Sequence, residues 1–199
     1  MSLSGCISAF GAMFWRLARC IILCISIVSV AAQAAWQSDT QNIMGTQVSV
    51  TAWHESDVNA NEAIAAVMAE MRRIDQSLSP YIESSELSRV NRLAVAAPVK
   101  VSRELAFLVD KSLYYSGVSK GAFDITFGSV GRYYDYREGR QPSAAQREKL
   151  LAAIDYRHVQ LDRKKRTLFF QHPHVYIDLG GIAKGYAVDR AADILLAAG

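Results

Sequence analysis

Apolar residues follow two different periods along this 199-residue chain. Between residues 64 and 78 they recur at helical spacing, so this stretch is expected to form an amphipathic helix that ends before Pro80. Residues 46–53 alternate instead, with Val48 and Val50 on one face, which is typical of a half-buried strand.

Serines mark the expected starts of three further helices. The run Ser84-Ser85-Glu86 is expected to cap a short helix that continues towards Asn91, and Ser102 a longer one with an apolar stripe. Residues 143–146 match a capping box ahead of a helix that ends near Ile154. Residues 182–198 are predicted to form the final helix.

Short apolar runs at 159–161, 168–170 and 175–178 are predicted to be strands. Helices and strands therefore alternate without an internal repeat or a low-complexity linker. We predict an α+β fold in which helices pack on mixed β-sheets.

The first 34 residues have the pattern of a secretory signal peptide. Arg16 and Arg19 precede an apolar stretch from 20 to 32, and Ala32 and Ala34 provide the small residues of a cleavage site. The alternative is an uncleaved membrane anchor, although the stretch is short for a span of about 20 residues. All three cysteines lie in this leader. We expect an exported, periplasmic protein whose domain, residues 35–199, needs no disulfide.

The net charge argues against a nucleic-acid partner. The chain has 22 basic and 19 acidic residues, and two of the arginines lie in the leader. The remaining 20 basic and 19 acidic side chains nearly cancel, whereas nucleic-acid-binding domains are strongly basic.

The run from Tyr176 to Asp189 carries the most chemistry. A short apolar stretch ends in Asp178, Gly180 and Gly181 turn the chain, and Lys184 lies in the first turn of a predicted helix. The N–H groups at a helix start attract anions, and glycine lets the backbone approach a ligand closely. The run suits a phosphate or pyrophosphate, although neither a Walker A loop nor a Gly-x-Gly-x-x-Gly fingerprint is present. The alternative is a tight turn with a solvated lysine.

Each of the other candidate binding residues has both a structural and a functional interpretation. Tyr81 either stacks on a flat ring or is a partly buried loop aromatic. Asp124 either accepts hydrogen bonds from a base or ribose, or caps the next turn. His172 and His174 flank a proline, and metal binding is the minor interpretation, because zinc needs further ligands.

In order along the chain, these segments resemble the ApbE family of FAD:protein FMN transferases. The resemblance rests on Met44-Gly45-Thr46, Leu78-Ser79-Pro80-Tyr81, the run 84–91, Gly121-Ala122-Phe123-Asp124-Ile125-Thr126 and Asp178-Leu179-Gly180-Gly181-Ile182-Ala183-Lys184-Gly185-Tyr186. It implies a T-fold-related domain, of which this chain holds the N-terminal part. Such enzymes bind FAD and a divalent metal, usually Mg²⁺.

The resemblance also implies the reaction and its partners. FMN is transferred from FAD to a Thr or Ser hydroxyl of an acceptor protein, and AMP is released. Acceptors in the family include subunits of NADH:quinone reductase and Rnf-type complexes, which would bring the enzyme close to the inner membrane. Some relatives hydrolyse FAD to FMN and AMP instead, so a FAD pyrophosphatase is an alternative.

Residue roles follow from the same resemblance. It implies that FAD is bound by Met44, Tyr81, Ala122, Phe123, Asp124, Asp178 and Lys184, and that the carbonyl of Gly181 is a metal ligand. The catalytic base stays unassigned. The family's other metal ligands, an Asp and a Thr, lie in a C-terminal half that does not occur before Gly199. We therefore expect a domain truncated at its C-terminal side, and a non-catalytic flavin-binding remnant is a further alternative.

Overall fold

The computed structural model describes residues 36–135 and 138–199. The predicted signal peptide lies outside the described residues, and none of the helices in the described part is long and apolar enough to cross a membrane. The elements, in chain order, are β1 (Trp36–Ile43), β2 (Thr46–Trp53), α2 (Asp57–Leu78), α3 (Glu86–Leu93), β3 (Val99–Lys100), α4 (Arg103–Val118), the 3₁₀ turn η1 (Ile125–Phe127), α5 (Gly128–Gly131), α6 (Ala144–Leu151), η2 (Tyr156–His158), β4 (Val159–Asp162), β5 (Thr167–Phe170) and α7 (Ala183–Ala198).

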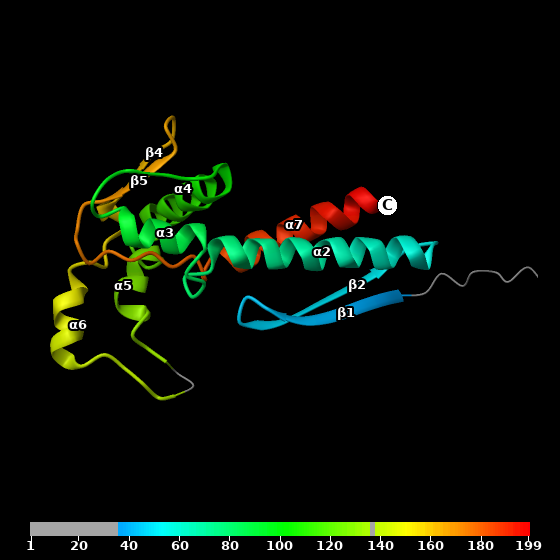
Figure 1. Cartoon of the computed structure of the whole chain (residues 1–199), viewed down its shortest axis with the longest axis horizontal. Coiled ribbons are helices and arrows are strands. Elements are labelled where there is room, and N and C mark those ends of the chain that lie inside the picture. Colours follow the sequence, from blue (N-terminus) through cyan, green and yellow to red (C-terminus); the bar gives the residue numbers. More distant parts are fainter. Residues whose placement is uncertain (1–35, 136–137) are drawn as a thin grey trace, which may run out of the picture.

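Helix α2 runs along the molecule and connects its two ends (Figure 1). Its apolar stripe is buried, as predicted, and Ser79 ends it just before Pro80. The stripe packs against α7 and against the hairpin formed by β1 and β2. Burial of this face, rather than helix propensity alone, therefore holds α2 in place.

The β1–β2 hairpin turns at Met44 and Gly45, which both have positive φ, 55° and 69°. Positive φ at both central residues is the geometry of a two-residue hairpin turn, and a glycine makes it accessible. Strand β2 has the predicted bounds. Strand β1 is not predicted by the sequence, because only its ends are apolar and its middle is polar.

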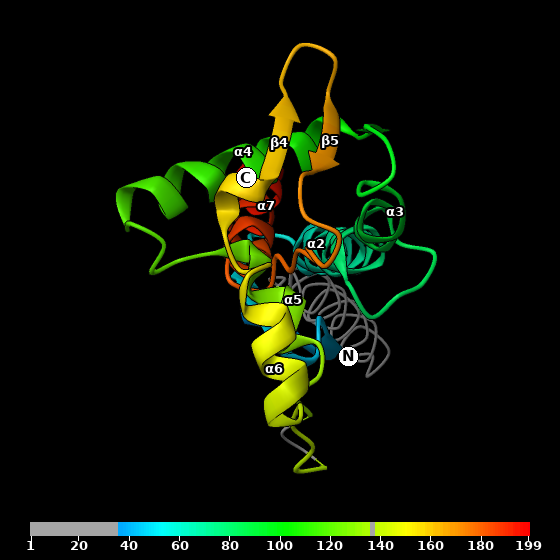
Figure 2. The same cartoon turned by 90° about the vertical axis from the view of Figure 1, so that its left-hand side faces the viewer.

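The other end of the molecule gathers α3–α6 and a three-stranded sheet in the order β3-β5-β4 (Figure 2). The predicted caps are confirmed, since the hydroxyls of Ser85, Ser102 and Ser143 each accept a hydrogen bond from the N–H three residues on. Helix α6 is shorter than predicted and ends at Leu151. The α+β class is confirmed, but both described sheets are antiparallel throughout rather than mixed.

The predicted strand at 175–178 is wrong. The segment is extended, but its backbone N–H and C=O groups form hydrogen bonds with side chains and with the 3₁₀ turn η1 instead of with a strand. The side-chain amide of Asn91 pairs with both backbone groups of Ile177. Its NH₂ group donates to the Ile177 carbonyl at 2.9 Å, and its oxygen accepts the Ile177 N–H at 2.8 Å. The Tyr176 N–H donates to the Ser129 hydroxyl at 3.0 Å, and the Asp178 N–H to the Ile125 carbonyl at 2.9 Å.

Three histidines gather beside the β4–β5 hairpin: His158 precedes β4, and His172 and His174 follow β5. The rings of His158 and His172 stack with centroids 5.3 Å apart, and His174 meets His172 edge-on at 5.7 Å. The described residues hold no group of three or more His, Cys, Asp or Glu side chains arranged to bind a metal ion. The described residues therefore give no support to the minor interpretation of His172-Pro173-His174 as a metal site.

Replacing Asn91 by alanine should lower the free energy of unfolding by about 2–4 kcal/mol, because two backbone groups beside the buried Ile177 lose their partners. Urea denaturation measures the change. Asn61→Ala removes one exposed amide hydrogen bond on α2 and is the matched control, with an expected change within about 0.5 kcal/mol. Equal effects of the two substitutions would contradict this role of Asn91.

Stability should fall as pH falls from about 7.5 to about 5.5, partly through His172. Burial and the positive charges of His158 and His174 lower the pKa of His172 below its usual value. The unfolded state then binds more protons than the folded state, so acid favours unfolding. His172→Gln should flatten this pH dependence in urea titrations. An unchanged slope for His172→Gln would be evidence against the coupling.

Candidate functional site

The glycine turn, residues 178–182, leads from the extended segment into α7. One carboxylate oxygen of Asp178 accepts the Gly180 N–H at 2.7 Å and tightens the turn. The N–H groups of Ile182 and Ala183 both donate to the Leu179 carbonyl. Within the described part of the chain, the N–H groups of Lys184 and Gly185 donate to no carbonyl. These two groups, at the positive end of a helix dipole, are available to an anion.

A pocket of about 470 Å³ lies beside the glycine turn, and we call it the glycine-turn pocket. Its lining combines Gly121–Ile125, Phe127, Gly128 and Ile154 with Asp178, Gly180 and Gly181. The size falls within the usual range of small-molecule sites. Five residues predicted from the sequence therefore meet here: Ala122, Phe123, Asp124, Asp178 and Gly181.

Two glycines are closely packed around this pocket. A Cβ at Gly128 would lie 2.9 Å from the Tyr176 carbonyl oxygen, so only glycine lets α5 approach the extended segment. A Cβ at Gly181 would lie 3.0 Å from the ring of Phe123. The glycine turn therefore packs closely against the 121–126 loop, and this packing determines the shape of the pocket.

Asp124 has the capping role that was its structural interpretation. One carboxylate oxygen accepts the Thr126 N–H at 2.8 Å and the Thr126 hydroxyl at 2.6 Å. The other accepts the Tyr156 N–H at 2.8 Å. Asp124 therefore joins the loop to η2 and shapes the pocket wall, and a ligand would have to share oxygens that are already hydrogen-bonded.

Tyr81 lines neither this pocket nor the groove described below, and its side chain is 84% exposed. The loop before it is fixed, because the Pro80 carbonyl accepts hydrogen bonds from the hydroxyls of Tyr176 and Ser88. Partial loss of water and the negative charge of Asp178 raise the pKa of Tyr81. The exposed ring is free to stack on a ligand.

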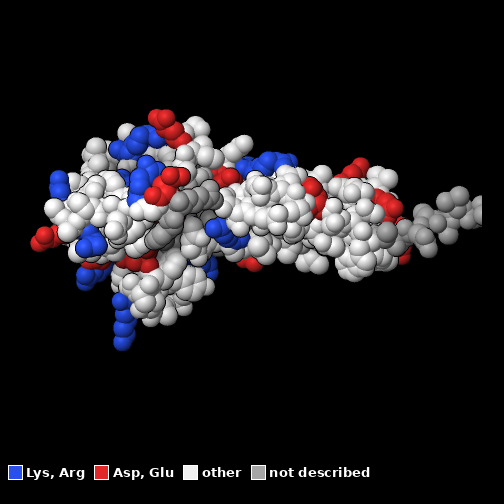
Figure 3. Space-filling model, turned by 90° about the horizontal axis from the view of Figure 1, so that it is seen from below, with Lys and Arg blue, Asp and Glu red and all other residues white. Residues whose placement is uncertain are grey.

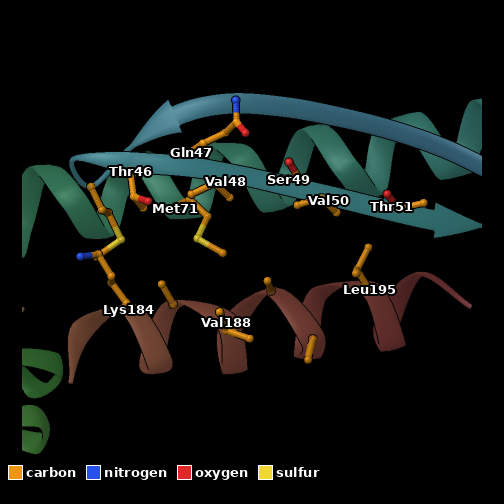
Figure 4. Close-up of a pocket in the computed structure, with 14 residues that line it drawn as sticks. Thr46, Gln47, Val48, Ser49, Val50, Thr51, Met71, Lys184, Val188 and Leu195 are labelled. Carbon is orange, nitrogen blue, oxygen red and sulfur yellow. The ribbon is translucent and has the colours of Figure 1, made fainter. Parts of the chain in front are cut away.

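Met44 and Lys184 lie together in a second hollow, between β2 and α7 (Figure 4). This β2–α7 groove has a volume of about 500 Å³, and most of its exposed lining is apolar although Lys184 and polar residues of β2 border it. Figure 4 shows the Lys184 side chain reaching from α7 towards the start of β2. The structure therefore divides the predicted residues between two hollows, which the first turn of α7 connects.

A hydrogen-bond network that sequence reasoning missed fixes the start of α7. The Tyr186 hydroxyl donates to Glu104 at 2.8 Å, and Arg73 binds the same carboxylate at 2.6 Å. Burial and the neighbouring Glu104 raise the pKa of Tyr186 to about 12, so the hydroxyl stays protonated and keeps donating. Tyr186 lies only two residues after Lys184, so the network orients this turn of the helix. Tyr186 and Glu104 are 82 positions apart, so no local pattern in the sequence predicts their hydrogen bond.

The described residues supply only part of a site for a divalent metal. The Gly181 carbonyl accepts no hydrogen bond in the described part of the chain, so its oxygen suits a ligand role. The nearest carboxylate in the turn, Asp178, already binds the Gly180 N–H with one oxygen. Mg²⁺ prefers six oxygen ligands, and these two groups alone do not provide them.

Charged side chains of both signs are interspersed on the face seen from below (Figure 3). The elongated part of that face is largely uncharged. This face therefore shows no broad basic surface.

Comparison with known proteins identifies the family. The ApbE family model matches residues 44–199. The FAD:protein FMN transferase of Haemophilus influenzae is 30% identical over 189 residues, which is 86% of this chain and 54% of the relative. That of Klebsiella pneumoniae is 28% identical over 192 residues, 90% of this chain and 54% of the relative.

Solved structures give the same result. The ApbE protein of Thermotoga maritima superposes with a TM-score of 0.76 and 29% identity, covering 82% of this chain and 53% of the other. The flavin transferase ApbE of Vibrio cholerae gives 0.74 at 25% identity, covering 83% and 55%. This chain therefore spans about half the length of these relatives. Its sequence motifs, its fold and its glycine turn agree with these matches: the chain belongs to the ApbE family.

Proposed function

We propose that this protein acts in FAD:protein FMN transfer, moving FMN from FAD to a Thr or Ser hydroxyl of an acceptor protein and releasing AMP. The observation that carries the proposal is the glycine turn. It presents two available N–H groups, those of Lys184 and Gly185, at the start of α7, and it borders a pocket of ligand size. Relatives that match most of this chain are named for this reaction.

The pyrophosphate of FAD is proposed to lie at the start of α7. Its oxygens would accept hydrogen bonds from the N–H groups of Lys184 and Gly185. The glycine-turn pocket, walled by Phe123 and Asp124, would hold the adenosine half, and the exposed ring of Tyr81 and the side chain of Met44 would contact the flavin. The hydrogen bond from the Tyr176 hydroxyl to the Pro80 carbonyl, which fixes the loop before Tyr81, supports this role.

In the transfer, the acceptor hydroxyl oxygen bonds to the phosphorus of the FMN half and the bond to the AMP phosphate breaks. Negative charge then develops on the departing phosphate, and the ammonium group of Lys184 would stabilise it. A bound Mg²⁺, with the Gly181 carbonyl as one ligand, would neutralise further charge on the pyrophosphate. The hydroxyl needs a base to become a good nucleophile, and none of the described residues is assigned that role.

The acceptor is proposed to be a subunit of an NADH:quinone reductase or Rnf-type complex. An exported enzyme in the periplasm would meet such a subunit beside the inner membrane. The support is the leader-like pattern of residues 1–34 together with the family's acceptors.

Incubating the chain with FAD, Mg²⁺ and an acceptor domain should add the mass of one FMN to the acceptor, as read by intact-mass spectrometry. An acceptor in which the target Thr is replaced by Val should gain nothing, and the Haemophilus influenzae relative in a parallel reaction shows that the acceptor is competent. FMN and AMP formed without an acceptor would favour a FAD pyrophosphatase instead. FAD binding without any product would favour a flavin-binding role.

Lys184→Ala should weaken FAD binding by about tenfold or more, because a full positive charge beside the pyrophosphate is lost. Quenching of flavin fluorescence measures the dissociation constant, and the difference should shrink as salt is raised. Lys164→Ala is the matched control. It removes the same charge at the exposed turn between β4 and β5, which is outside the glycine turn. Equal dissociation constants for the two variants would remove Lys184 from the proposed site.

A further inference from the structure

The turn between β4 and β5 consists of four basic residues in a row, Arg163 to Arg166, and the proposed function does not use them. The hairpin projects beyond α4 (Figure 2). Arg163, Lys164 and Lys165 are exposed, and Arg166 is half-buried. These charges are therefore presented to solvent ahead of the surrounding surface.

The pairing of the three-stranded sheet brings two further basic residues to this turn. Lys100 on β3 lies opposite Thr167, the first residue of β5, and the Val101 N–H donates to the Arg166 carbonyl at 2.9 Å. Arg103 begins α4 two residues later. We call the resulting set the basic surface; it consists of Lys100, Arg103, Arg163, Lys164, Lys165 and Arg166.

Two carboxylates beside the basic surface are already engaged. Asp110 pairs with Arg163 at 2.6 Å, and Asp162 accepts the Lys165 N–H at 2.8 Å, which tightens the turn. Among the described residues, no carboxylate forms an ion pair with the ammonium group of Lys164 or Lys165. These two groups are therefore available to an external anion, in a chain whose charges after the leader nearly cancel.

An aromatic ring lies beside these charges. Phe169 points to the outer face of the sheet, because its neighbours Leu168 and Phe170 are buried on the inner face. It borders a hollow of about 550 Å³ together with Pro98 and Lys165. Basic side chains on a projecting turn, next to an aromatic ring, fit the headgroup region of a bilayer, where phosphate groups meet apolar chains.

We propose that the basic surface docks this protein on an anionic phospholipid bilayer. Lys164 and Lys165 contact the phosphate groups of the lipids, and Phe169 lies at the level of the headgroups. Attraction of this kind grows with the number of basic side chains near the membrane and is screened by salt. The inference rests on the hairpin and does not require the proposed FMN transfer.

The test is co-sedimentation of the full chain with vesicles. One set of vesicles is phosphatidylcholine, and the other contains phosphatidylglycerol as about one third of the lipid. Any contribution of the apolar residues 20–32 is common to both sets and cancels in the ratio of the two dissociation constants. We expect the anionic vesicles to bind at least tenfold more tightly, and the ratio should approach one as salt is raised.

Lys164→Glu combined with Lys165→Glu should abolish most of this preference, lowering the ratio at least tenfold. Arg147→Glu combined with Lys149→Glu is the matched control. It reverses two exposed charges on α6, on the opposite side of the molecule from the hairpin in Figure 2, and should keep the ratio within about twofold. Both variants retain Arg16 and Arg19, so the leader contributes equally, and circular dichroism verifies folding.

Equal ratios for the two double variants would overturn the proposal, and so would equal binding of both sets of vesicles by the unaltered chain. Inorganic phosphate at constant ionic strength should not release the protein. Release by phosphate would indicate a site for single phosphate groups instead of a bilayer. Binding of a poly-glutamate peptide without binding of anionic vesicles would indicate an acidic protein partner, and would equally overturn the proposal.

Discussion

The two hydrogen bonds between Asn91 and the backbone of Ile177 are the constraint on which the rest of this structure depends. The extended segment 175–179 connects the three-stranded sheet to α7 and has no strand partner. Its position is therefore set by one amide side chain, one serine hydroxyl and one loop carbonyl. Because Asp178 and the glycine turn follow directly, any displacement of this segment would move the anion site and the first turn of α7 together.

Much of the fold could be predicted from local signals. The serine caps at Ser85, Ser102 and Ser143 and the apolar stripe of α2 are contacts between residues close in sequence, and the structure has them as expected. The errors concern partners that are distant in sequence. Residues 175–178 have the composition of a strand but bond to Asn91, Ser129 and Ile125, and no sequence period encodes such an arrangement. Strand β1 pairs with β2 although its middle is polar.

The candidate site shows the same limit. The sequence identifies the glycine turn and its lysine, because a carboxylate, two glycines and a helix start are all local features. It does not show that Asp124 has both oxygens engaged, or that Lys184 and Met44 lie across a different hollow from Phe123. The network of Tyr186, Glu104 and Arg73 brings three helical segments together and depends entirely on tertiary packing.

Helix α7 connects the two hollows physically. Its first turn holds the N–H groups and the ammonium group proposed for the pyrophosphate, whereas its body forms the uncovered wall of the β2–α7 groove. Lys184 and Met44 line one hollow, and Phe123 and Asp124 line the other, so FAD would have to reach both hollows to meet all of the residues proposed for it. The hydrogen bond from Tyr186 to Glu104, together with Arg73, holds the turn of α7 that follows Lys184. This network would therefore set the position of Lys184 relative to the glycine turn, because both belong to the same short stretch of backbone.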